Sequence, residues 1–323
     1  MRKTLRMILS VLVITALSVL CFAACGQNTT FNIVAPDGAT YAALVQMRHD
    51  VSEIDGNALS FSIEQESLIS SAMTNGSADF IIAPTNIGNN IHEAWNKNNN
   101  LPEYKLTAAV SWGVLYIIST DSSLNPRSEF PYTAAGLDEF LSQFSGKTLE
   151  TIGLSAIPGK TAEYIFSEKN VSLNGVSAPS EIVSKVKLQQ TVTGIIAEPV
   201  LSSIRNECEV LASVGGIYEE LSGKGFPMAS LFVKASIAET REKAVNECLD
   251  KLKTSIDFFN DSPKQVGIWA EEFGDSAAIK AATIEAAAAN MNLKFRSSEE
   301  SKDAVSALLQ NIGNSVSEGL FLK

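Results

Sequence analysis

Strand-like and helix-like segments alternate along the first hundred residues, and this alternation restricts the fold more than any other feature of the sequence. The segments come in pairs of a strand and a helix, at 31–35 and 39–47, at 59–63 and 66–74, and at 78–83 and 87–97. Hydrophobic residues recur with the period of a strand or of a helix in each segment. Regular alternation of this kind predicts a mostly parallel β-sheet that is covered by helices.

The pattern is interrupted and then restarts in the middle of the chain. Residues 105–120 read as two apolar strands around Ser111-Trp112-Gly113. A second α/β unit follows, with helices expected at 137–144, 159–169, 179–186 and 199–205 and strands at 148–154, 193–197 and 209–212. A strand at 228–233 leads out of it, and the rest of the chain predicts helices at 239–260, 263–272, 276–290 and 298–315.

These patterns predict an α/β protein of two lobes. Because the helical tail has no sheet of its own, we expect it to cover the first lobe. Lobe 1 then comprises residues 31–118 and 228–323, and lobe 2 comprises residues 119–227. The chain crosses between them near 115–120 and again near 225–230. Two such crossings form a hinge, and the cleft between two hinged lobes is a natural ligand site.

The N-terminus has the layout of an export signal. Basic residues precede an apolar run that is short for a membrane-spanning helix, and Phe22-Ala-Ala-Cys25 follows. Ala-Ala-Cys resembles a bacterial lipobox, in which Phe22 stands where Leu is usual. We therefore predict a signal peptide over residues 1–24, lipidation of Cys25 and a lipidated tether over 25–30, which would anchor the protein to the cell membrane outside the cytoplasm. The alternative is an ordinary secreted protein in which Cys25 is incidental.

Charge and residue types argue against several functions. The chain has 25 basic and 36 acidic residues; the leader holds three basic residues and no acidic one, so its removal changes the net charge from −11 to −14. An acidic protein is poorly suited to nucleic acid or to anionic lipid. His49 and His92 are far apart, so we expect no metal site, no cofactor and no histidine-based triad. Cys208 and Cys248 are expected to be buried free thiols rather than a disulfide.

Residues 153–161, GLSAIPGKT, look like a phosphate-binding P-loop but do not meet its requirements. A P-loop has four residues between its first glycine and Gly-Lys-Ser/Thr, so that successive N–H groups surround a phosphate. Here five residues separate Gly153 from Gly159, and Pro158 removes an N–H group. An exported protein also meets little ATP. We therefore reject an ATPase and interpret the segment as a strand-to-helix turn.

Several short motifs, taken in order, resemble a known family. They are Ile33-Val-Ala-Pro-Asp-Gly38, Asn75-Gly-Ser-Ala-Asp79 with Pro84-Thr-Asn86, Gly146-Lys147 with Pro158-Gly-Lys-Thr161, Ala197-Glu-Pro-Val200, and Asn260-Asp-Ser-Pro263. With the lipobox, they are similar to the extracytoplasmic substrate-binding proteins of bacterial ABC importers, in the branch that binds nitrate, sulfonates, taurine and pyrimidine precursors. The resemblance covers nearly the whole mature chain. Thr191-Val-Thr departs from it, because the family usually shows Gly-x-x-Asp-Ala before this strand.

The resemblance implies a two-lobed, type II periplasmic-binding-protein-like fold. It also implies a monomeric protein that captures a small molecule in the interlobe cleft and delivers it to the permease of an ABC transporter. In an open α/β sheet, ligands bind at the carboxyl ends of strands, where helix N-termini offer N–H groups. The turns at 36–40, 84–86 and 158–161 meet that description. The ligand-binding candidates are Asp37, Gly38, Thr40, Thr85, Asn86, Trp112, Gly159, Lys160, Thr161 and Glu198.

Each of these candidates also has a purely structural interpretation. Trp112 fits a core as well as a cleft wall, and Glu198 fits a solvated loop. The small polar residues of the turns could simply cap helices, and they are Asp37, Thr85, Asn86 and Thr161.

Two other functions remain open at this point. One is an enzyme built on the same two-lobed fold and acting on a small metabolite, which would need a base or a nucleophile in the cleft. The turns offer only Asp37, Lys160 and Glu198 for that purpose. The other is an adhesin or sensor domain that transports nothing.

Overall fold

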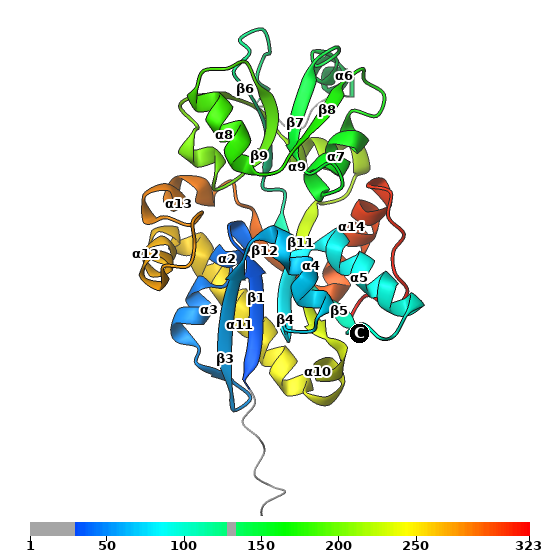
Figure 1. The fold of residues 1–323 in the computed structure, drawn as a ribbon, viewed down its shortest axis with the longest axis vertical. Coiled ribbons are helices and arrows are strands. Elements are labelled where there is room, and N and C mark those ends of the chain that lie inside the picture. The colour runs from blue at the N-terminus through cyan, green and yellow to red at the C-terminus, as the bar shows by residue number, and fades with distance from the viewer. Residues whose placement is uncertain (1–29, 128–133) are drawn as a thin grey trace, which may run out of the picture.

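The protein contains two β-sheets that follow one another along its long axis (Figure 1). The structure, a computed structural model, describes residues 30–127 and 134–323, so that the expected signal peptide and the lipidation site at Cys25 lie outside the described residues. A large sheet has seven strands in the order β12-β5-β11-β4-β1-β3-β2, and a small sheet has five in the order β10-β6-β9-β7-β8. Over the described ranges, every helix is too short or too polar to cross a membrane.

The large sheet combines strands from both ends of the chain. Its strands are β1 (Phe31–Pro36), β2 (Glu53–Ile54), β3 (Asn57–Glu64), β4 (Phe80–Pro84), β5 (Tyr104–Trp112), β11 (Pro227–Lys234) and β12 (Leu293–Ser297). Strand β1 runs parallel to β3 and β4, whereas β11 is antiparallel to β4 and β5. The carboxyl ends of β1, β3 and β4 therefore lie next to one another at the same end of this sheet.

Helices cover both faces of the large sheet. One face carries α2 (Ala39–Ala42), α3 (Val45–Asp50), α11 (Glu242–Asp261), α12 (Pro263–Phe273) and α13 (Ala281–Ala288), and the other carries α4 (Glu66–Thr74), α5 (Thr85–Lys97) and α14 (Ser298–Asn311). The short α10 (Ala235–Thr240) follows β11. Successive strand residues point to opposite faces, so Ile33 belongs to the first core and Val34 to the second.

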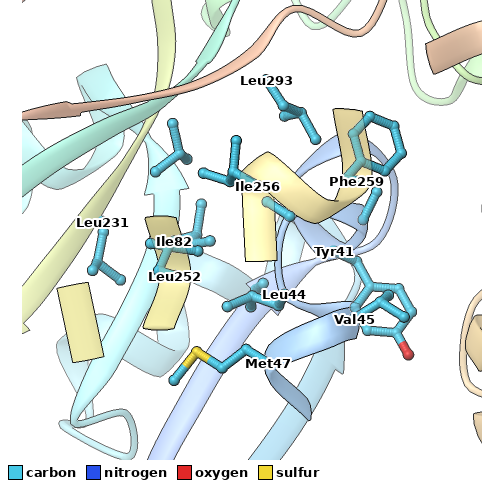
Figure 2. Packing of buried hydrophobic residues seen from close by; sticks show 14 of the residues in the cluster. Tyr41, Leu44, Val45, Met47, Ile82, Leu231, Leu252, Ile256, Phe259 and Leu293 are labelled. Atoms are coloured by element: carbon cyan, nitrogen blue, oxygen red, sulfur yellow. The ribbon is translucent and has the colours of Figure 1, made fainter. Parts of the chain in front are cut away.

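The first of these cores attaches the C-terminal part of the chain to the N-terminal part. Figure 2 shows Leu252 and Ile256 of α11 packed with Leu44 and Ile82, and all four side chains are at most 1% exposed. Full burial of a large apolar side chain contributes about 1.5–3 kcal/mol. The helices after residue 240 therefore stabilise the large sheet.

The small sheet is built from the middle of the chain. Its strands are β6 (Leu115–Ser119), β7 (Thr148–Ile152), β8 (Ser172–Val176), β9 (Thr193–Ala197) and β10 (Glu209–Ser213). Helices α6 (Ala134–Ser142), α7 (Ile157–Ile165) and α9 (Val214–Ser222) cover one face, and α8 (Pro179–Lys187) and the 3-10 turn η1 (Leu201–Ser203) cover the other. Strand β7 is parallel to β8 and β9, so their carboxyl ends also share an edge.

The structure confirms the α/β alternation and corrects it in several places. Residues 199–205 form only the turn η1, since seven residues that include two serines are a poor helix. The tail is not helical throughout, because β12 joins the large sheet. Strands β2 and β8 and helices α9 and α10 were not predicted, and the helix expected at 39–47 is divided into α2 and α3. The sequence of β8, SLNGV, lacks a strong apolar pattern because this edge strand is largely exposed.

Candidate ligand-binding site

The predicted turns lie where strands of the two sheets end. The turn at 36–40 follows β1, and that at 84–86 spans the end of β4 and the start of α5; the turn at 158–161 lies in the first half of α7, just after β7. Glu198 directly follows β9. In Figure 1, α2 lies at the end of the large sheet that is nearer to the small sheet, and α7 lies on the side of the small sheet that is nearer to the large one.

The side chains in the turn after β1 already have partners within the protein. The Asp37 carboxylate accepts hydrogen bonds from Ser276 Oγ (2.5 Å) and from the N–H groups of Ala277 (2.8 Å) and Ala278 (3.1 Å). It also accepts one from the N–H of Gly38 (2.8 Å), and the Thr40 hydroxyl donates to Pro36 O (2.7 Å). The interpretation of Asp37 as a cap of α2 is wrong, because its carboxylate holds the segment before α13 instead.

Gly38 is the open position in this turn. Its φ is +111°, a conformation that favours glycine, and no atom lies within 4 Å of the point that a Cβ would occupy. A ligand could therefore approach the backbone here.

Thr85 and Asn86 begin α5 without capping it. Thr85 Oγ1 donates to Pro227 O (2.8 Å) and lies 2.9 Å from Ser230 Oγ, which ties the start of α5 to β11. No side-chain hydrogen bond caps this helix, so the interpretation as helix caps is wrong for both residues. Asn86 is 4% exposed, and its Oδ1 is buried without a hydrogen-bond partner.

The GLSAIPGKT segment is a strand-to-helix turn, as predicted. A Cβ on Gly159 would lie 2.5 Å from Gly153 O and 2.6 Å from Leu154 Cα, so this glycine makes room for its own turn. Lys160 Nζ pairs with Glu163 Oε2 at 2.8 Å on the surface. Thr161 is fully buried and does not cap α7, and its Oγ1 has no hydrogen-bond partner.

Trp112 packs where the chain passes from one sheet to the other. Its Nε1 donates to Lys294 O (2.9 Å), and its ring lies over Gly225, where Cζ3 is 3.0 Å from the position of a Cβ. The ring is only partly buried. These contacts give Trp112 a packing role at the crossing.

Glu198 is buried rather than solvated, so its interpretation as a solvated loop carboxylate is wrong. It is 2% exposed, and burial raises the pKa of its carboxyl. Its Oε2 accepts from the N–H of Ser202 (2.9 Å), and its Oε1 lies 3.5 Å from Asn290 Nδ2 and 3.8 Å from Arg205 Nη1. Tyr116 Oη donates to Asn290 O (3.1 Å). Glu198 thus connects the small sheet to the segment between α13 and β12.

Two residues at these positions were missed by the sequence reasoning. Asn290 faces Glu198 from a segment far away in the sequence, and no local pattern indicates that contact. Glu66 is the first residue of α4, two positions beyond the end of β3. The rule that found the other turns, a polar residue directly after a strand, could have found Glu66 as well.

The described residues offer few side chains for metal binding or thiol chemistry. Over residues 30–127 and 134–323, histidine, cysteine and carboxylate side chains nowhere gather in a group of three that could hold a metal ion. Cys208 and Cys248 are both free; Cys248 is buried as expected, whereas Cys208 is only partly buried. Burial raises the pKa of the Cys248 thiol to about 12 and that of Cys208 to about 11, so neither is a reactive thiolate at neutral pH.

Comparison with known proteins identifies the architecture. No protein-family model and no curated protein matches the sequence. Among solved structures, an ABC transporter protein from Parabacteroides distasonis superimposes with a TM-score of 0.71 at 18% identity, over 91% of this chain and 99% of that one. The alkanesulfonate-binding protein SsuA from Xanthomonas axonopodis pv. citri, bound to MOPS, gives 0.61 at 12% identity, over 93% and 96%.

A third structure supplies the general description of this fold. The CA3427 gene product of Candida albicans, described as having the generic periplasmic binding protein fold, gives a TM-score of 0.55 at 10% identity, over 88% of this chain and 89% of that one. The chain has the periplasmic-binding-protein fold. This confirms the fold class that the sequence predicted. Identities this low support the fold alone, so the function is argued from the site.

Proposed function

We propose that the protein is the solute-binding component of an ABC importer and captures a small molecule between its two sheets. We draw the lobe boundaries before β6 (Leu115–Ser119) and before β11 (Pro227–Lys234), because these strands belong to the small and the large sheet, respectively. The proposed lobe 1 then comprises residues 31–114 and 227–323, and the proposed lobe 2 comprises 115–226. The proposed site lies where the turn after β1 and the start of α5 face the start of α7. The periplasmic-binding-protein fold supports a solute-binding role, and the similar structures include a transporter protein and a sulfonate-binding protein.

One observation carries this proposal. Asn86 Oδ1 and Thr161 Oγ1 are two of the five buried side-chain atoms without hydrogen-bond partners in the described residues, and these two lie near the N-terminal ends of helices that belong to opposite sheets. Most buried polar atoms in native proteins are hydrogen-bonded, and leaving one unpaired costs about 1–3 kcal/mol. A ligand bound between the two helices would supply the missing partners. The first N–H groups of α5 and α7 would add donors for an acceptor atom on that ligand.

The proposal extends to the location and the partners of the protein. The export signal at residues 1–24 and lipidation at Cys25 would hold a monomer on the outer face of the cell membrane, next to the permease that receives the solute. An enzyme is the less favoured alternative. The turns at 36–40, 84–86 and 158–161 contain no cysteine or histidine, and the carboxylate of Asp37 is fully engaged by hydrogen bonds.

Native mass spectrometry of protein purified from its own host tests the function directly. A solute-binding protein should carry a small molecule that it releases chemically unchanged on denaturation. The double variant Asn86→Ala, Thr161→Val removes both unpartnered atoms and should lose that molecule while keeping its fold. Thr107→Val is the matched control, because Thr107 is a buried residue of β5 outside the proposed site and its hydroxyl bonds Leu231 O within the protein. A ligand-free wild type, or release of an altered product, would contradict the proposal.

A further inference from the structure

A groove on the surface of the large sheet's body lies apart from the proposed solute site. It has a volume of about 400 Å³ and is bounded by the junction of α11 with α12, by α13 and by the start of β12. None of the predicted ligand-binding residues lines it. Pockets that hold small molecules have volumes of about 300–1,000 Å³, so the groove can hold one.

Two opposite charges line this groove from different elements. Ala288 and Ala289 follow Glu285 by three and four residues, so all three share one face at the end of α13. Lys294 of β12 and Pro263, the first residue of α12, line the groove as well. Of the described residues in the lining, only Glu285 and Lys294 are charged. The groove therefore offers one negative and one positive group to a bound molecule.

Neither charge is neutralised within the protein. Throughout the described part of the chain, the side chains of Glu285 and Lys294 form no hydrogen bond and no ion pair, so their charged atoms lie more than 4.0 Å apart. Asn260 Nδ2 donates to Leu293 O (3.1 Å), which leaves Asn260 Oδ1 as an acceptor beside the groove. The Glu285 carboxylate and this amide oxygen can accept from an ammonium group, which has three N–H donors. The Lys294 ammonium can donate to a carboxylate.

The groove is connected to the strands that cross between the two sheets. Trp112 N donates to Asn292 O (3.1 Å), and Asn292 Nδ2 donates to Gly113 O (3.1 Å). Trp112 Nε1 donates to Lys294 O (2.9 Å). Two residues of the groove, Asn292 and Lys294, therefore hold the end of β5 where the chain passes into the small sheet. A molecule bound to them would reinforce this attachment.

We propose that this groove is a second binding site, which takes a small zwitterion with its ammonium group on Glu285 and its carboxylate on Lys294. Leu293, which is 1% exposed, and Pro263 would contact the carbon chain between the two charges. A molecule with one charge leaves the other side chain unpaired, so it should bind more weakly. The site goes beyond the proposed function and does not require it. It also gives a role to Asn260-Asp-Ser-Pro263, a motif that the proposed solute site does not use.

Calorimetric titration at neutral pH with a matched series of small molecules tests this assignment. The zwitterions are β-alanine, γ-aminobutyrate and ε-aminocaproate, which vary the distance between the charges, and butylamine and butanoate carry one charge each. The zwitterion of best-fitting length should bind the wild type, and Glu285→Gln and Lys294→Gln should each weaken it about three- to tenfold. Glu271→Gln on α12 and Lys187→Gln on α8 remove the same charges at exposed positions elsewhere and should leave binding unchanged.

The outcomes separate this site from the proposed solute site. The double variant Asn86→Ala, Thr161→Val should bind the zwitterion normally, and loss of binding in it would overturn the inference by placing the probe between the sheets. Binding of no zwitterion, unchanged affinity in Glu285→Gln and Lys294→Gln, or equal affinity for butylamine or butanoate would also overturn it. The bound zwitterion should slow hydrogen exchange at the N–H of Trp112, and unchanged exchange would overturn the connection to the crossing strands. Native mass spectrometry of protein from its host decides the proposed function independently.

Discussion

The two sheets are joined at two places besides the crossing strands, and these two junctions differ in chemistry. At the apolar junction, α14 packs Leu308 and Ile312 into the core of the small sheet, while its Val305 and Leu309 pack into a core of the large sheet. At the polar junction, Glu198 and Tyr116 contact Asn290, Arg205 lies beside Glu198, and α13 contacts η1.

The difference indicates which junction can open. Separating apolar side chains exposes them to water at a cost that scales with the buried area. Polar groups that separate exchange their protein partners for water, so the net cost of losing a hydrogen bond is only about 0.5–1.5 kcal/mol. We therefore expect the apolar junction to remain closed as a pivot and the polar junction to open and close around a solute. The four predictions that follow test this contrast, beginning with the largest expected effect.

Truncation of the apolar junction should have the largest effect. Leu308 is fully buried, so Leu308→Ala should lower the free energy of unfolding by about 2–5 kcal/mol. Leu309→Ala is the matched control, because Leu309 is equally buried but packs only in the core of the large sheet. Both should destabilise the protein in denaturant titrations. Only Leu308→Ala should speed hydrogen exchange in α9 of the small sheet, and equal exchange in both variants would refute the pivot.

The crossing strands themselves allow a second test. Gly113 lies between β5 and β6 with a φ of +80°, and a Cβ there would be 3.2 Å from Gly215 Cα. Gly113→Ala should therefore cost about 1–3 kcal/mol through backbone strain and crowding. Gly223→Ala is the control. Its φ of +65° imposes backbone strain, but no atom lies within 4 Å of the Cβ position, so the variant adds no crowding. If the two variants melt alike, the close approach of Gly113 to Gly215 does not constrain the crossing.

The sequence predicts features that depend on neighbouring residues better than features that depend on contacts between distant segments. The order of strands and helices follows from local periodicity, and α4 was predicted with the correct ends because Asn75-Gly76 stops it. The turns at the carboxyl edges were predictable for the same reason. The hydrogen-bond partners of Asp37 and Glu198 were not, because they come from segments 239–241 and 92 residues away. Local patterns therefore locate the candidate residues but not what their side chains bind.

The third prediction concerns the pH dependence of the polar junction. Burial raises the pKa of Glu198 above its ordinary value of 4.5, so the folded state holds this proton more tightly than the unfolded state. Ionisation then lowers stability as the pH rises through the interval between the unfolded and the folded pKa, and the loss is complete above the folded pKa. A tenfold difference in proton affinity between the two states corresponds to about 1.4 kcal/mol.

Glu198→Gln removes this titration. The free energy of unfolding of the variant relative to the wild type should rise as the pH increases from below 4.5, and then level off. Denaturant titrations across this interval measure the difference. Glu299→Gln, on the exposed first turn of α14, is the control for the loss of one carboxylate elsewhere in the protein. A constant difference would mean that Glu198 is not desolvated at the junction.

The smallest and most specific effect is expected when one asparagine side chain is truncated at each junction in turn. Asn290 Nδ2 faces Glu198 at the polar junction, and Asn311 Nδ2 donates to Tyr218 Oη (3.1 Å) at the apolar one. Each alanine variant loses one amide and should lose no more than about 1 kcal/mol of stability. Asn290→Ala should nevertheless shift the protein towards an open form with a larger radius of gyration in small-angle scattering. Asn311→Ala should leave the radius unchanged, because buried leucine and isoleucine side chains still hold that junction. Expansion of both variants, or of Asn311→Ala alone, would show that the two junctions do not divide into a pivot and an opening side.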